Sequence, residues 1–173
     1  MKPRTYLVAT SLLIFAGSAH AQTAPTDAQI ASIVVTANQV DIDAAKLAET
    51  KASSKEVKDF ARRMVIDHSA LNKSATELAQ KLKLKPESNS TSEALKKGGD
   101  ENLAKLKTLS GADFDRAYID NEVKYHQAVL DMLDKTLVPN ARNPELKTLL
   151  VQARPTFVSH LEHAKQVQAK VGT

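Results

Sequence analysis

The chain has 173 residues, a formal net charge of +4 and no cysteine. Without cysteine there is no disulfide framework, so a buried core has to supply the stability of the fold. The weak positive charge argues against nucleic acid as a partner, because that kind of binding usually needs a clustered basic face.

Residues 1–21 have the pattern of a secretory signal peptide. Lys2 and Arg4 form a basic start, an apolar run follows, and an Ala-x-Ala cleavage site ends at Ala21. The apolar run is too short for a permanent membrane span, which needs about 20 residues. We therefore expect a mature protein that begins at Gln22, is periplasmic or secreted, and has no transmembrane segment. Association with the outer membrane stays open.

Four long stretches of the remaining chain place apolar residues at helical spacing. We expect a flexible lead-in over residues 22–28 and a single domain over residues 29–173. The expected helices are a first one capped by Asp27 and ending near Lys51, a second capped by Ser53 or Ser54 and ending before Pro86, a third from Ser110 to near Pro139, and a fourth capped by Asn143.

The stretch between the second and third helices is different, because it is polar at first and then contains Gly98-Gly99. We interpret it as a short helical crossover that is interrupted at the two glycines. No segment alternates with period two, so strands are not expected. The sequence therefore predicts an all-α four-helix bundle with an additional short helical crossover between helices two and three.

Five ionisable residues lie on the apolar seams of these helices: Asp41, His68, Glu122, His126 and His160. At about 1.5 Å of rise per residue, they share roughly one level along the bundle. Buried charged residues are usually paired or bound to a metal, and a layer of imidazoles and carboxylates suits zinc, iron or copper. In the alternative interpretation, these histidines are structural and form hydrogen bonds to carboxylates or tyrosines.

Several short motifs carry a family resemblance. They are Lys55-Glu56-Val57-Lys58-Asp59-Phe60-Ala61-Arg62-Arg63-Met64-Val65, Asp67-His68, Gly111 with Phe114-Asp115, and Pro155 with His160-Leu161. Together, over about Ile30 to Lys165, the sequence resembles the exported bacterial proteins called domain of unknown function 4142. This resemblance implies a ferritin-like bundle in the periplasm or at the outer membrane, without a defined activity.

Ferritin-like di-iron sites use Glu-x-x-His motifs, and this chain contains none. An iron oxidase or an iron store is therefore disfavoured. The sequence allows a single histidine-rich site of His68, His126 and His160 with Asp41 or Glu122.

Three functional hypotheses follow. The leading one is an exported bundle that binds a divalent metal, or retains a vestigial polar site. The alternative is a non-catalytic envelope or stress-related protein whose surface binds a protein partner, with Leu95 and Leu103 exposed at the Gly98-Gly99 break. A third is pH sensing by buried histidines. The sequence offers no catalytic nucleophile set and no glycine-rich cofactor loop, and it leaves the oligomeric state open.

Overall fold

A computed structural model describes residues 24–171, so the predicted signal peptide, residues 1–21, lies outside the described residues. Every regular element in the described range is helical, which confirms the predicted all-α bundle. The elements are α1 (Asp27–Lys51), α2 (Lys55–Lys81), α3 (Ser90–Thr108), α4 (Gly111–Met132), a π-helical turn (Leu133–Leu137), α5 (Val138–Asn140) and α6 (Pro144–Val171).

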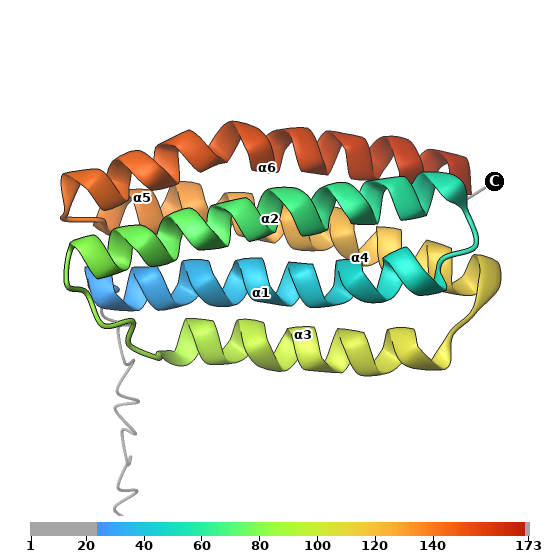
Figure 1. The fold of residues 1–173 in the computed structure, drawn as a ribbon, viewed down its shortest axis with the longest axis horizontal. Helices are drawn as coiled ribbons and strands as arrows, with labels where there is room; N and C mark the ends of the chain where they lie inside the picture. The colour runs from blue at the N-terminus through green and yellow to red at the C-terminus, as the bar shows by residue number, and fades with distance from the viewer. Residues whose placement is uncertain (1–23, 172–173) are drawn as a thin grey trace, which may run out of the picture.

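Four long helices, α1, α2, α4 and α6, surround the core, and α3 lies outside them (Figure 1). Helix α1 packs against α2, α3 and α4, while α6 packs against α4 and α2. The chain reverses between α1 and α2, and α3 then carries it back along the bundle before α4 begins (Figure 1). As a result α2 and α4 run in the same direction, which is the topology of a bundle with one full-length crossover.

The crossover differs from the sequence prediction at Gly98-Gly99. Helix α3 runs unbroken through both glycines, so the predicted interruption is wrong. A Cβ atom on Gly99 would lie 2.6 Å from Cγ1 of Val40, so the missing side chain lets α3 approach α1 closely. This contact offsets the helix propensity that glycine loses, which is about 1 kcal/mol per residue. Leu95 and Leu103, expected to be exposed by a break, are half-buried.

Side-chain caps set where the helices begin. Ser54 caps α2 and Asn143 caps α6, as predicted. Helix α1 is capped by Thr26 and not by Asp27, and Gln29 completes a capping box with Thr26. The Asp27 carboxylate instead accepts hydrogen bonds from the backbone N–H groups of Arg142 and Asn143, just before α6, which ties the starts of the two helices together at one end of the bundle.

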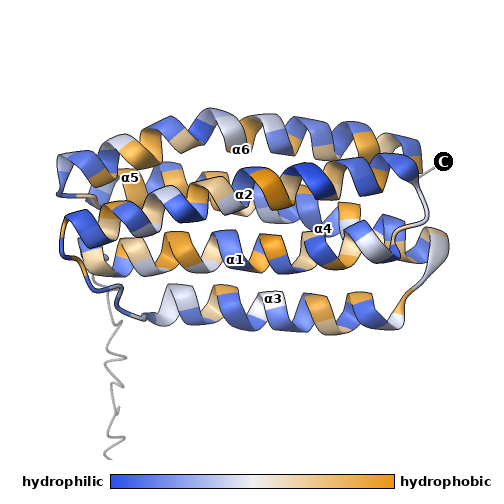
Figure 2. Cartoon of the chain, viewed as in Figure 1, coloured by the Kyte–Doolittle hydropathy of each residue, from blue (hydrophilic) through white to orange (hydrophobic). Residues whose placement is uncertain are grey.

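The interior consists of two apolar clusters with a polar layer between them. One cluster includes Phe60, Met64 and Phe114, and the other includes Ile33 and Leu133. Figure 2 shows that hydrophobic and hydrophilic residues alternate along every long helix, as expected for amphipathic helices in water. Within residues 24–171 no helix combines the length and the hydropathy that a membrane span needs.

Candidate metal centre

All five residues predicted for the metal site meet in the polar layer. They come from four helices: Asp41 from α1, His68 from α2, Glu122 and His126 from α4, and His160 from α6. Each is at most 1% exposed. The structure therefore brings the five side chains together in the buried core, at the level where the sequence predicts a polar layer.

Three of the donor atoms form a nearly equilateral triangle. His68 Nε2 lies 3.4 Å from His126 Nε2, and Asp41 Oδ2 lies 3.3 Å from the first nitrogen and 3.5 Å from the second. A tetrahedral metal with bonds of about 2.0 to 2.2 Å holds its ligand atoms about 3.3 to 3.6 Å apart. The triangle therefore has the dimensions of one face of a coordination tetrahedron.

His160 supplies a third imidazole beside this face. One ring nitrogen from each of His68, His126 and His160 lies within 4.8 Å of the other two. The His160 ring centroid is 5.1 Å from that of His68 and 5.3 Å from that of His126. A second, overlapping group consists of Asp41, Glu122 and His126, each of which places one ligand atom within 4.8 Å of the other two. Glu122 thus stands beside the triangle and not within it.

Two of the rings have their tautomers fixed by hydrogen bonds at Nδ1, the ring nitrogen that is not part of the triangle. The Nδ1–H of His68 donates to Oδ1 of Asn38 at 2.8 Å, and the Nδ1–H of His126 donates to the backbone carbonyl of Glu122 at 3.0 Å. Each ring then carries its lone pair on Nε2, and these are the two nitrogens that face each other and Asp41. Such rear partners are typical of histidines that bind metals.

The third ring has a charged rear partner. The Nε2–H of His160 donates to Oδ2 of Asp67 at 2.8 Å, and Arg63 Nε donates to the same oxygen at 3.3 Å. This arrangement leaves Nδ1 of His160 with a lone pair, and that buried atom has no hydrogen-bond partner in the described chain. Each of the three imidazoles therefore has one buried nitrogen without a proton, and the three rings lie next to one another in the core.

Burial shifts the pKa values of the layer toward the neutral forms. Burial lowers the pKa of His68 well below its usual value, with added repulsion from His126 and His160, and lowers the pKa of His126 to about 3. It also lowers the pKa of His160, although the hydrogen bond to Asp67 acts in the opposite direction. The histidines are therefore neutral at pH 7, which is the form that binds metals.

The two buried carboxyl groups respond in the opposite sense. Burial raises the pKa of Asp41 to about 8, and burial together with Asp41 raises the pKa of Glu122 well above its usual value. Both Asp41 oxygens and Oε2 of Glu122 form no hydrogen bond in the described chain. Leaving such atoms unpaired in a core costs about 1 to 3 kcal/mol each. A divalent cation would satisfy them, and its charge balances two ionised carboxylates.

Two residues around the site were missed as functional partners. Asn38 lies one helical turn before Asp41 on the same face of α1, so its spacing could have indicated it. Asp67 directly precedes His68 in the sequence, but it is only partly buried, so an argument from apolar seams does not select it. His163, which was not included in the predicted set, lies outside both groups, and its ring packs against Phe60.

Four long helices around a buried histidine and carboxylate layer, with a long crossover helix, define the class of this protein. A family model described as "Domain of unknown function (DUF4142)" matches residues 15–167, so the chain belongs to this family. No curated protein matches the sequence. A solved structure described as "CopM in the Cu(II)-bound form" has a TM-score of 0.67 at 22% identity, covering 86% of this chain and 99% of that one. This likeness shows the shared fold.

Proposed function

We propose that the protein binds one divalent transition metal ion in its core. The ligands are Nε2 of His68, Nε2 of His126, Nδ1 of His160 and a carboxylate oxygen of Asp41, with Glu122 as the adjacent carboxylate. The observation that supports this most strongly is the direction of the lone pairs. Each ring donates its N–H to a partner outside the triangle, and each leaves its other nitrogen without a proton.

The bare site is costly, which also supports the proposal. Two imidazole lone pairs face each other at 3.4 Å, and Asp41 Oδ2 faces both of them. Lone pairs on three such atoms repel one another unless a proton or a cation lies between them. Because burial raises the pKa of Asp41 to about 8, its carboxyl group holds a proton at pH 7. That proton can satisfy one of the two imidazole nitrogens but not both, whereas a divalent cation would satisfy all three atoms.

The donor set favours copper or zinc over calcium or magnesium. Imidazole nitrogens suit zinc, copper, iron and nickel, and among the divalent ions copper binds most tightly to a given nitrogen and oxygen site. The structural neighbour CopM was solved in a Cu(II)-bound form, which makes Cu(II) the first ion to test. With the predicted signal peptide, the proposed role is a periplasmic metal-binding bundle without a catalytic activity.

Metal content tests the proposal. Untagged protein, its His68→Ala variant and a His163→Ala control would be loaded with Cu(II) or Zn(II), desalted and measured by elemental analysis. We expect about one ion per chain in the wild type and in His163→Ala, and a loss in His68→Ala, because His68 is one of the proposed ligands and His163 is not. Equal metal content in all three proteins, or a wild type that cannot be loaded, would contradict the proposal.

A further inference from the structure

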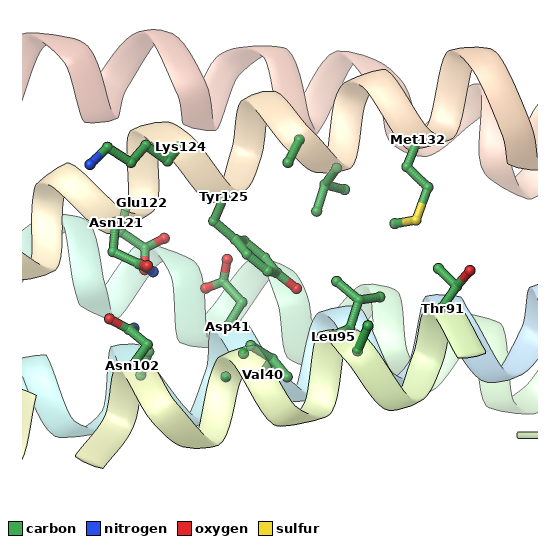
Figure 3. Close-up of a pocket in the computed structure, with 16 residues that line it drawn as sticks. Val40, Asp41, Thr91, Leu95, Asn102, Asn121, Glu122, Lys124, Tyr125 and Met132 are labelled. Carbon is green, nitrogen blue, oxygen red and sulfur yellow. The ribbon is translucent and has the colours of Figure 1, made fainter. Parts of the chain in front are cut away.

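A cavity of about 450 Å³ lies between α1, α3 and α4, and it reaches the edge of the candidate metal centre (Figure 3). Its wall includes Asp41 and Glu122 but none of the three histidines of the candidate metal centre. Figure 3 shows Glu122 pointing from α4 toward α1, close to Asp41. The carboxylates therefore stand between the cavity and the imidazoles.

The inner end of this cavity has polar atoms without partners. Both oxygens of Asp41 and Oε2 of Glu122 are buried and form no hydrogen bond in the described chain. Asp41 Oδ2 is also the atom that lies 3.3 Å from His68 Nε2 and 3.5 Å from His126 Nε2. An ion held by the carboxylates from the cavity side is thus one ligand exchange away from the histidines.

We propose, resting on the metal binding proposed above, that this cavity is the route by which the ion reaches the core. Glu122 and Asp41 are the first protein ligands, and the ion then moves onto His68, His126 and His160. Carboxylate oxygens suit this transit role, because they can replace part of the hydration shell before the nitrogen ligands bind. The exposed Lys124 lies at the rim, and its side chain points away from Asp41 (Figure 3).

Helix α3 has fewer buried residues than α1 or α4, which form the other walls of this route. Of its nineteen residues only Ser92 and Leu106 are buried, and they lie toward opposite ends. The middle of the helix contains Gly98, which lines the cavity and is exposed. Elements with few buried contacts open locally at low free-energy cost, so a small movement of α3 can admit an ion.

The other groove near the centre is a poorer route. It lies between α2 and α6 and is lined by Arg63, Asp67 and Ala70. Arg63 Nε donates to Asp67, and its Nη2 donates to Ser159 at 2.9 Å, so a guanidinium group covers the path to His160. An incoming ion would have to break these hydrogen bonds and displace the guanidinium group, whose charge is already paired with Asp67.

Side chains added at Gly98 test the route. A Cβ atom at this position meets no atom within 4 Å, so Gly98→Leu can fold and extends a side chain at the cavity wall. Gly98→Ala has the same backbone effect with one carbon, and Ala70→Leu narrows the other groove. The probe is Co(II), whose visible absorption reports both the rate of uptake and the final coordination. Glu122→Gln tests the first ligand with little change of shape.

We expect Gly98→Leu to take up Co(II) about tenfold more slowly than the wild type, because access then waits for α3 to open. Its final spectrum and stoichiometry should equal those of the wild type. Gly98→Ala and Ala70→Leu should load at the wild-type rate, and Glu122→Gln should load more slowly. Wild-type kinetics in Gly98→Leu, or slow loading in Ala70→Leu, would overturn the route. If the wild type took up no Co(II), Cu(II) or Zn(II) at equilibrium, the proposed function itself would fail.

Discussion

The Nε2–H of His160, which is buried, donates to Oδ2 of Asp67, which is partly exposed, across 2.8 Å. Of the three cluster imidazoles, this is the one whose rear hydrogen bond goes to a carboxylate, while His68 uses the amide of Asn38 and His126 uses a backbone carbonyl. A carboxylate behind an imidazole raises the basicity of the opposite nitrogen. The three rings therefore differ as metal ligands, and we expect the His160 nitrogen to be the most basic of the three.

Asp67→Asn tests this inequality. The amide oxygen can still accept the Nε2–H of His160, so the ring should keep its orientation but lose the nearby negative charge. We expect metal affinity to fall by about 10-fold to 100-fold, the usual effect of removing a rear partner. Competition titration against a chelator would measure it. Asp59→Asn, which removes a surface carboxylate from the same helix, should leave affinity unchanged.

Asn38→Ala should affect both stability and metal binding. Asn38 is 2% exposed, and its loss leaves the Nδ1–H of His68 buried without an acceptor. We expect the free energy of unfolding to fall by about 1 to 3 kcal/mol. Metal affinity should fall as well, since the tautomer of His68 is no longer fixed. Urea unfolding of the metal-free and metal-loaded forms would separate the two effects.

Gln39→Ala is the matched control for Asn38→Ala. Gln39 is the next residue along α1, is exposed, and donates to Asp43 at the surface. Its removal should change the free energy of unfolding by less than about 0.5 kcal/mol. If both variants lost the same stability, the hydrogen bond from His68 to Asn38 would have no special role.

The sequence identified the cluster residues because an ionisable side chain on an apolar seam is a strong signal. Asp41, His68 and His160 each interrupt a run of helically spaced apolar residues, and a burial argument applies to each of them. Asn38 carries no charge, and Asp67 lies at the boundary of the core, so neither gave that signal. Their roles depend on which ring nitrogen they face, and only the folded geometry shows this.

The continuity of α3 through Gly98 and Gly99 could not be predicted from the sequence for a different reason. Glycine lowers helix propensity, and two glycines together predict an interruption when only the local chain is considered. The compensating contact joins Gly99 to Val40, which is far away in the sequence. Pairwise packing of this kind is not visible in the periodicity of either helix.

The metal-free protein should lose stability as the pH rises from about 6.5 to 8. The pKa of Asp41 is about 8 in the folded state and 3.8 as its usual value, so the folded state holds this proton more tightly than the unfolded state. The contribution of Asp41 is then complete below pH 4 and declines up to about pH 8. Glu122 acts in the same direction. Each such group lowers the free energy of unfolding as the pH rises between its pKa in the unfolded state and its pKa in the folded state.

The histidines determine the acid side of the same profile. His126 has a pKa of about 3 in the folded state against its usual 6.5, so its contribution is complete above pH 6.5 and is lost as the pH falls toward 3. Urea unfolding of metal-free protein between pH 5 and 8 would measure both limbs. Asp41→Asn should reduce the decline above pH 6.5, while Asp43→Asn, at the exposed face of α1, should not. A flat profile would contradict these pKa shifts and remove the pH-sensing hypothesis.

Gly99→Ala should destabilise the protein, whereas Gly98→Ala should stabilise it. A Cβ atom at Gly99 would lie 2.6 Å from Cγ1 and 2.7 Å from Cγ2 of Val40, and a β-branched side chain in a helix has little freedom to move away. Overpacking of this kind costs about 1 to 3 kcal/mol. At Gly98 the added Cβ meets nothing within 4 Å, so the gain in helix propensity of about 1 kcal/mol should remain. Urea unfolding of both variants would show whether the free energy of unfolding falls or rises in each.

The Val40→Ala and Gly99→Ala double variant should recover most of the stability lost in Gly99→Ala, because it removes the two methyl groups that cause the clash. Equal stabilisation by Ala at both glycines would show that α3 does not approach α1 this closely.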